Sequence, residues 1–301
     1  MHVPVLLNES LGILNIAEGD IYLDATLGGG GHAAEVWNRF GNKVVIAGID
    51  ADSQAVEIAK SRLSIEGAEP KFAVLNFRHI DNVPELLGIG KPNKILFDLG
   101  WNKMQFETGG DEVGRGFSFQ HDEPLVMTFA SESSDAAFTA RTIVNEWGEE
   151  SLQTIIEGYG EERFAKRIAK EIVEQRTVAP IETTFQLVEI IKKATPLWYH
   201  FKRIHPATRT FQALRITVND ELQTLKDSLE KALEILQPGG RIAVITFHSL
   251  EDRIVKRFFK EADDLGKANL LIKKPVVASE QEQSQNPRSR SAKLRAIEKQ
   301  K

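Results

Sequence analysis

Short apolar runs alternate with amphipathic stretches over the first hundred residues of this chain. Runs of strand length, bounded by turn-forming residues, lie at 20–26, 43–50, 71–77 and 93–100, and the stretches between them include segments of helical periodicity. A strand, a helix and a second strand in this order form a right-handed βαβ unit. The pattern therefore predicts a parallel sheet with helices on both faces.

A helical segment interrupts this pattern. From Met104 to His205 the sequence contains no convincing strand, and its apolar residues recur at helical spacing. We therefore expect one α/β domain, formed by residues 1–103 and 213–301, that is split by an inserted helical domain, residues 104–212.

Strand patterns return in the last third of the chain. A long amphipathic helix is expected at 219–236, followed by a strand at 240–249 and another helix. Two extended segments, 269–277 and 291–299, are expected to form a hairpin at the edge of the sheet, joined by the polar stretch 279–287.

The composition excludes several kinds of site. The chain has 301 residues and no cysteine, which excludes thiolate nucleophiles and zinc–thiolate sites. The histidines His32, His205 and His248 lack the spacing of a ligand set, so no metal site is expected. Since neither a membrane-spanning run nor a signal peptide is evident, we expect a cytoplasmic protein without a membrane partner.

The charges are unevenly distributed, although the net charge is −5. Residues 105–162 contain thirteen acidic and two basic side chains, whereas residues 163–215 contain eleven basic and four acidic ones. Residues 286–301 contain six basic side chains and one acidic. Two basic surfaces on an acidic protein are typical of docking to a phosphate backbone, although solvated helix faces and a basic terminus produce the same statistics.

Four consecutive glycines follow the first expected strand, in "YLDATLGGGGHAAEVW", residues 22–37. Glycine has no Cβ atom, so a ligand can approach the main chain, and the helix that begins near His32 points free N–H groups at it. About twenty residues later Asp50 ends the second strand, where a carboxylate can accept hydrogen bonds from both ribose hydroxyls. The arrangement predicts a nucleoside-containing cofactor; the alternative is that the glycines only relieve crowding.

The glycine turn alone does not distinguish a dinucleotide cofactor from S-adenosylmethionine. The dinucleotide motif G-x-G-x-x-G is matched only loosely by "GGGGHAA". Asp98, at the end of the fourth strand, favours S-adenosylmethionine, because amino-methyltransferases have an acidic or amide side chain there. A strand-end aspartate that caps a turn, and a nicotinamide-dependent oxidoreductase, are the alternatives.

Sequence blocks along nearly the whole chain resemble those of one family. They include "DATLGGGGH", "HPATRTFQALRITVNDEL" and "NPRSRSAKLRAIEK", and they resemble the bacterial small-subunit rRNA cytosine-N4 methyltransferases, the RsmH or MraW family. The resemblance implies a Rossmann-like class I methyltransferase fold with an inserted helical domain, and S-adenosylmethionine as the methyl donor. The implied acceptor is the exocyclic N4 of a cytidine near the P site in 16S rRNA of the small ribosomal subunit. Relatives also suggest a homodimer.

The resemblance also implies roles for single residues. The loop after Asp98 reads "WNKMQ", residues 101–105, and retains only the glutamine of the family pattern, while residues 122–132 also depart from it. These departures leave a non-catalytic relative that binds rRNA and cofactor as an alternative. The implied cofactor contacts come from Gly30, Gly31, His32, Asp50, Phe77, Asp98 and Gln105.

Methylation at N4 needs no covalent nucleophile. Methylation of cytosine C5 requires one, normally a cysteine, whereas the amino nitrogen can attack the methyl group directly once its hydrogens have an acceptor. We hypothesise that Asp98 is this acceptor, and that Trp101 or Phe117 stacks on the flipped cytosine. Near the last main strand, Ser249 and Asp252 are expected to form a capping box.

Arginines and hydroxyl groups crowd the stretch "RIHPATRTFQALR", and a second basic stretch, "NPRSRSAKLR", lies near the end of the chain. Such residues suit contacts with RNA phosphates, and a target base in folded rRNA must be flipped or single-stranded. The predicted RNA surface consists of Arg203, His205, Arg209, Arg215, Arg288 and Arg290.

Overall fold

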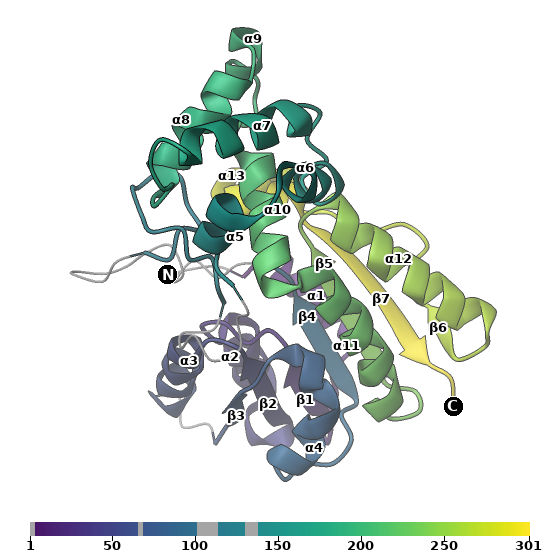
Figure 1. The fold of residues 1–301 in the computed structure, drawn as a ribbon. Helices are drawn as coiled ribbons and strands as arrows, with labels where there is room; N and C mark the ends of the chain where they lie inside the picture. Colours follow the sequence, from purple (N-terminus) through teal and green to yellow (C-terminus); the bar gives the residue numbers. More distant parts are fainter. Residues whose placement is uncertain (1–3, 66–68, 101–113, 130–137) are drawn as a thin grey trace. The chain divides into compact units, whose positions relative to one another are not determined.

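A mixed sheet of seven strands organises the chain (Figure 1). The computed structural model describes residues 4–65, 69–100, 114–129 and 138–301. The strand order is β3-β2-β1-β4-β5-β7-β6, and β7 runs antiparallel to both of its neighbours. The expected Rossmann-like α/β fold is therefore confirmed. The strands are β1 Ile21–Asp24, β2 Val45–Asp50, β3 Lys71–Val74, β4 Lys94–Asp98, β5 Arg241–Thr246, β6 Ala268–Leu270 and β7 Lys293–Lys299.

The chain divides into two compact units. The first comprises Met1–Trp101 and Leu222–Lys301 and contains the sheet, and the second comprises Asn102–Glu221. The chain thus returns to the first unit nine residues later than expected, because the apolar side chains of α10 (Thr208–Asn219) belong to the core of the second unit. None of the helices among the described residues is long and apolar enough to cross a bilayer.

Alternate residues of the strands build two cores on opposite faces of the sheet, as the period of a strand requires. Tyr22 and Leu96 belong to one core, which also takes side chains from α1 (Leu7–Leu14), α2 (Gly31–Phe40) and α3 (Ser53–Ile65). Leu23 and Phe97 belong to the other, with side chains from α4 (Val83–Leu86), α11 (Glu221–Ile235) and α12 (Ser249–Asp264). Because β1 runs parallel to both β2 and β4, the carboxyl ends of these three strands lie side by side at the same end of the sheet.

The last third of the chain follows the expected order of elements, with one correction. The long helix expected at 219–236 is α11, which is separated from α10 by Asp220 in the left-handed conformation, φ 47°. The last two extended segments do pair, since β6 and β7 are antiparallel neighbours. The polar stretch between them is not a simple turn, because it contains α13 (Glu280–Gln285), which starts at the side-chain cap of Ser279.

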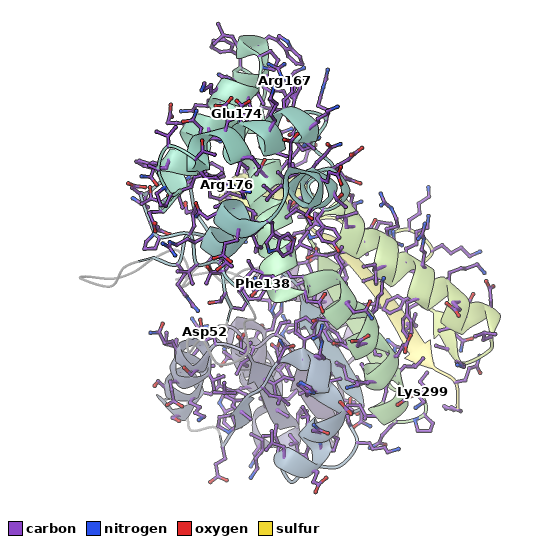
Figure 2. The ribbon with its side chains drawn as sticks, viewed as in Figure 1. Asp52, Phe138, Arg167, Glu174, Arg176 and Lys299 are labelled. Carbon is purple, nitrogen blue, oxygen red and sulfur yellow. The ribbon has the colours of Figure 1, made fainter. Side chains whose placement is uncertain are left out.

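Lys299, near the end of β7, caps the end of α11. Its Nζ donates hydrogen bonds to the carbonyl groups of Leu233 and Leu236 (Figure 2).

The second unit is helical in its described part. An apolar core joins its helices, and Pro124 and Thr183 form an isolated β-bridge. The absence of strands expected after Met104 holds for the described residues of this unit. Besides α10, its helices are α5 Ala140–Glu146, α6 Glu149–Gly158, α7 Ala165–Arg176, α8 Thr184–Ala194 and α9 Leu197–His200.

Candidate functional site

The glycine turn between β1 and α2 is held by the carboxylate of Asp50 at the end of β2. Oδ2 of Asp50 accepts a hydrogen bond from the Gly28 N–H at 2.8 Å, and Oδ1 accepts one from the Asp52 N–H at 2.9 Å. Each oxygen of a carboxylate has a second lone pair. Asp50 can therefore hold the turn and still accept hydrogen bonds from ribose hydroxyls.

Gly30 and Gly31 begin α2 and are closely packed. Gly30 has a φ of 72°, and no side chain of the described residues caps the helix at this position. A Cβ atom on Gly30 would lie 3.0 Å from Cβ of Ala59, and one on Gly31 would lie 2.6 Å from Cγ of Pro4. The missing side chains thus relieve crowding within the protein, while the uncapped N–H groups of the first turn suit a ligand.

Asp98 ends β4 with one carboxyl oxygen sealed from solvent. The side chain is 25% exposed, but Oδ1 is buried and has no hydrogen-bond partner in the described part of the chain. Burial raises the pKa of Asp98 well above its usual range; the charge of Asp24 adds to this shift, whereas Arg288 opposes it. A buried acceptor without a partner is a candidate for binding a ligand or for catalysis.

Asp24, at the end of β1, is a site residue that the sequence reasoning missed. It is 1% exposed and accepts hydrogen bonds from the Tyr22 hydroxyl and the Thr26 N–H, both at 3.2 Å. Burial raises the pKa of Asp24 to about 7 and that of Asp50 to about 6. With Asp98, three carboxyl groups thus end three neighbouring strands, an arrangement that favours a cationic ligand. The signal was available, because Asp24 ends its strand directly before the glycine turn.

His32 and Phe77, two further predicted cofactor residues, have defined packing partners. Nδ1 of His32 lies 3.8 Å from Oδ2 of Asp98, and Nε2 lies 3.3 Å from the carbonyl oxygen of Val5. Phe77 follows β3 and meets the ring of Phe97 edge to face, with centroids 5.9 Å apart. The first unit thus brings His32 beside Asp98 and holds Phe77 against the sheet.

The two residues expected to stack on the target base have different outcomes. Trp101 lies outside the described residues, as does Gln105, the last of the predicted cofactor contacts. Phe117 is 9% exposed and stacks on Phe129, with centroids 5.6 Å apart, in the core of the second unit. The expectation that Phe117 stacks on the cytosine therefore needs correction, because its face is already covered by another ring.

The start of α12 also differs from expectation. His248 is the N-cap: its Nδ1 accepts a hydrogen bond from the Glu251 N–H at 3.4 Å, and the Glu251 carboxylate accepts one from the His248 N–H at 3.2 Å. The capping box predicted for Ser249 and Asp252 is wrong, because a histidine nitrogen caps the helix one residue earlier. His248 is 11% exposed and serves the start of this helix.

Two of the predicted RNA residues in the second unit are held by other groups. Arg215 forms a bidentate pair with Glu221 at 2.8 and 2.9 Å, and both side chains are nearly buried. Arg209 donates to the carbonyl oxygen of Glu161. Arg215 is therefore a structural residue, a correction to its predicted place on an RNA surface.

Arg203 and His205 lie where the chain leads into α10. Arg203 is exposed. His205 stacks on Phe119 with centroids 4.5 Å apart, and burial lowers its pKa. Of this pair, Arg203 has the more accessible cationic group.

Arg288 and Arg290 belong to the first unit, in the short 3-10 helix Pro287–Ser291 before β7. Arg288 lies close enough to Asp98 to lower its pKa. The basic stretch near the end of the chain is consequently part of the sheet domain, and its first arginine belongs to the surroundings of the candidate site.

The sequence reasoning also missed exposed aromatic residues in the second unit. Trp198 of α9 is 48% exposed and Phe201 is 81% exposed. The guanidinium of Arg163 lies 5.1 Å from the ring centroid of Trp198, and Lys202 Nζ lies 5.4 Å from it. The guanidinium of Arg167, labelled in Figure 2, lies 5.9 Å from the ring centroid of Phe164. Aromatic rings among cations are typical of surfaces that bind single-stranded nucleic acid.

Comparison with known proteins identifies one family. The sequence profile of the MraW methylase family matches residues 1–300. A protein of Symbiobacterium thermophilum named ribosomal RNA small subunit methyltransferase H is 48% identical, over 99% of this chain and 96% of that protein. A protein of the same name from Clostridioides difficile is 44% identical over 99% of this chain and 98% of its own length. The crystal structure of an rRNA methylase from Streptococcus thermophilus superposes with a TM-score of 0.47 at 12% identity, covering 100% of both chains.

Proposed function

Because this chain belongs to the MraW methylase family of S-adenosylmethionine-dependent rRNA methyltransferases, we propose that it methylates the exocyclic N4 of a cytidine near the P site in 16S rRNA. The small-subunit target is supported by the names of its relatives. The single observation that carries the chemistry is the buried Oδ1 of Asp98, which has no hydrogen-bond partner among the described residues and lies at the carboxyl end of the sheet, beside the glycine turn.

The residues at this edge fit the methyl donor. Asp50 would hold the ribose, the first-turn N–H groups of α2 at Gly31 and His32 would face the polar amino-acid part, and Phe77 would lie beside the adenine. The carboxyl groups of Asp24 and Asp98 offset a positive charge. Gln105 completes this proposed set, although it lies outside the described residues.

When bound, S-adenosylmethionine supplies a methyl group on a positively charged sulfur. Asp98 would accept a hydrogen bond from the cytosine amino group, which favours an sp³-like nitrogen whose lone pair is no longer delocalised into the ring. As the new N–C bond forms the C–S bond breaks, the sulfur leaves as a neutral thioether, and the methylated nitrogen releases one proton. Trp101 stacks on the base and orients it. No metal ion or covalent nucleophile is required, which agrees with a chain that contains no cysteine.

The RNA contacts would come from both units. Arg203, with Trp198 and Phe201 nearby in the chain, provides a cationic and aromatic surface for unpaired bases and phosphates. In the sheet domain, Arg288 and Arg290 would bind phosphates near the target nucleotide.

The test is methylation of 16S rRNA in small subunits by the purified protein, followed by mass spectrometry of the digested nucleosides. We expect N4-methylated cytidine that depends on S-adenosylmethionine. A protein that binds the donor and the RNA but leaves the cytidine unmodified would instead be a non-catalytic relative. A parallel titration with NAD tests the oxidoreductase alternative, for which saturable binding of NAD in place of S-adenosylmethionine is required.

A further inference from the structure

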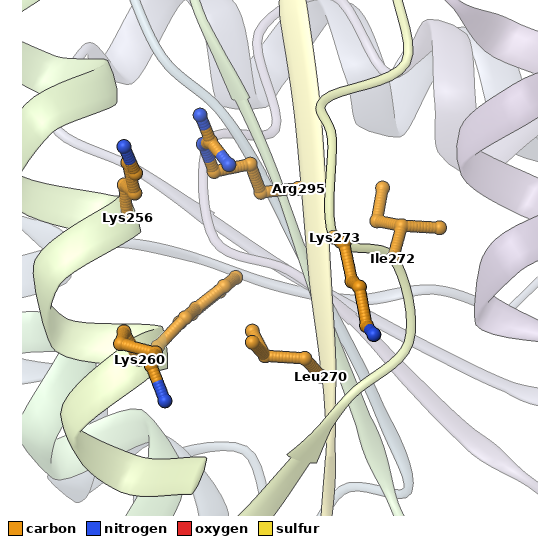
Figure 3. A pocket seen from close by; sticks show the side chains of 7 residues that line it. Lys256, Lys260, Leu270, Ile272, Lys273 and Arg295 are labelled. Atoms are coloured by element: carbon orange, nitrogen blue, oxygen red, sulfur yellow. The ribbon is translucent and has the colours of Figure 1, made fainter. Parts of the chain in front are cut away.

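A small basic cavity of the sheet domain is lined by residues of α12, β6 and β7 and of the segment that follows β6 (Figure 3). Its volume is about 90 Å³. Phe259 of α12 and Leu270 of β6 supply apolar side chains to its lining, and Lys256, Lys273 and Arg295 supply cationic ones. The cavity therefore combines an apolar floor with several positive charges.

Arg295, in the middle of β7, is a largely buried cationic residue of the cavity lining. Its side chain is 10% exposed, and its Nε donates to Oδ1 of Asp252 at 2.7 Å. A guanidinium has five N–H donors, and no group in the described part of the chain accepts from the two terminal nitrogens of Arg295. These nitrogens are not sealed from solvent either. A fork of donors thus remains for a ligand.

Lys256 and Lys273 add charge to this fork. Both are exposed, and neither forms an ion pair with any residue that the structure describes. Figure 3 shows the head groups of Lys256 and Arg295 at the same end of the cavity, with Lys273 on its other side. Lys260 also borders the cavity, but it is paired with Asp264 and contributes little free charge.

We propose that this cavity binds a phosphate group. An arginine fork can donate two parallel hydrogen bonds to phosphate oxygens, and the ammonium groups of Lys256 and Lys273 add positive charge to the lining. Asp252 offsets only part of this charge, since Lys293 also contacts it at 3.1 Å.

The phosphate comes from the rRNA backbone, an assignment that rests on the proposed function. Lys293 and Arg295 are two residues apart on one face of β7, which separates them by about 7 Å along the strand. The 3-10 helix that carries Arg288 directly precedes β7. Basic residues thus recur along the chain from Arg288 to Arg295, the arginine that lines the cavity, and such a series suits a polyanionic strand.

The test compares two doubly charge-reversed variants. Lys256→Glu with Lys273→Glu reverses the cavity charge at exposed positions, and Lys91→Glu with Lys226→Glu is the matched control at exposed, unpaired lysines of the same unit. We expect the cavity variant to bind small subunits roughly tenfold more weakly at low salt, with a shallower salt dependence, and the control to change less than about twofold. Equal affinities of the two variants would overturn the RNA assignment.

Inorganic phosphate distinguishes the two sources of this ligand. Phosphate at millimolar concentration should raise the melting temperature of the unaltered protein but not that of the cavity variant, with chloride at equal ionic strength as the reference. Stabilisation by phosphate without an effect on RNA affinity would mean a site for free phosphate and would overturn the RNA source. If neither the melting temperature nor the RNA affinity responds, the site itself is rejected. Because these readouts require no methyl transfer, their failure is separable from failure of the proposed reaction.

Discussion

The imidazole of His32 and the carboxyl group of Asp98 face each other, with Nδ1 3.8 Å from Oδ2. This separation is too long for a hydrogen bond, so the two groups interact through space. Because the carbonyl oxygen of Val5 lies near the other nitrogen of His32, the ring is held in place beside the carboxyl group. The start of the chain thus helps to shape the surroundings of the proposed catalytic residue.

Replacement of Asp98 should separate catalysis from cofactor binding. Asp98→Ala removes the proposed acceptor for the amino group, and we expect kcat to fall by about 10²- to 10³-fold while the affinity for S-adenosylmethionine changes far less. Single-turnover methylation and calorimetric titration of the donor measure the two quantities. Equal losses in both would make Asp98 a cofactor residue only.

Asp24 should link stability to pH. Its pKa is about 7 in the folded protein and is ordinarily about 3.9, so the folded state holds a proton that the unfolded chain has released between these values. Stability from this group is therefore present below about pH 4 and is lost as the pH rises toward 7. Asp24→Asn, which keeps an acceptor oxygen, should gain stability relative to the unaltered protein as the pH is raised from 5 to 8.

Urea unfolding at several pH values checks this expectation, with Glu85→Gln as the control at an exposed carboxylate. The upper limit of the change is about 1.4 kcal/mol per pH unit for one proton. A stability difference between Asp24→Asn and the unaltered protein that stays constant from pH 5 to 8 would contradict the raised pKa.

The Asp24→Asn variant should also bind S-adenosylmethionine more weakly at pH 8, since it lacks the carboxylate charge.

Gly30 and Gly12 should respond oppositely to alanine. At Gly30 a Cβ atom meets Ala59 at 3.0 Å and φ is 72°, so Gly30→Ala should lower the free energy of unfolding by about 1–2 kcal/mol. At Gly12, inside α1, a Cβ atom meets nothing within 4 Å, and Gly12→Ala should raise it by about 0.5–1 kcal/mol. Urea denaturation of both variants measures the free energy of unfolding. Similar losses of stability at both positions would reject the local strain at Gly30.

The aromatic residues around α9 should bind unpaired RNA bases. Trp198→Ala with Phe201→Ala should weaken binding of a single-stranded rRNA fragment by about 1–3 kcal/mol for each stacked base, with an unchanged dependence on salt. Val178→Ala is the control, because Val178 is apolar, lies in the same unit and is 82% exposed. Fluorescence anisotropy at several salt concentrations is the measurement. A loss that appears only in the slope against salt would point to phosphate contacts instead of stacking.

Much of the sheet domain could be predicted from local pattern. The strands up to β5 lie within the predicted ranges, since burial on both faces of a parallel sheet requires continuous apolar runs. Asp50 and Asp98 could be chosen for the same reason, because a polar residue at the end of such a run lies at the ligand-binding edge. Asp24 satisfies this rule too and was overlooked beside the glycines.

The remaining features depend on side-chain contacts that residue type and spacing do not reveal. Arg215 resembles a phosphate ligand in its arginine-rich stretch, but a carboxylate six residues away occupies its guanidinium. Phe117 could have been a stacking platform until the fold placed Phe129 against its face. Neither partner can be identified from spacing, because the irregular loop between Phe117 and Phe129 and the left-handed residue Asp220 between α10 and α11 bring the side chains together.

The amino-acid sequence by itself determined the alternating strands and helices, the glycine turn, the strand-end carboxylates and the family, since each depends on residues that are neighbours in the chain. Only the tertiary structure decided that β7 runs between β5 and β6, that one oxygen of Asp98 is buried without a partner among the described residues, and that Arg295 lines a cavity. Strand order, burial and electrostatics arise from contacts between segments that are distant in the sequence, and local periodicity does not predict these contacts.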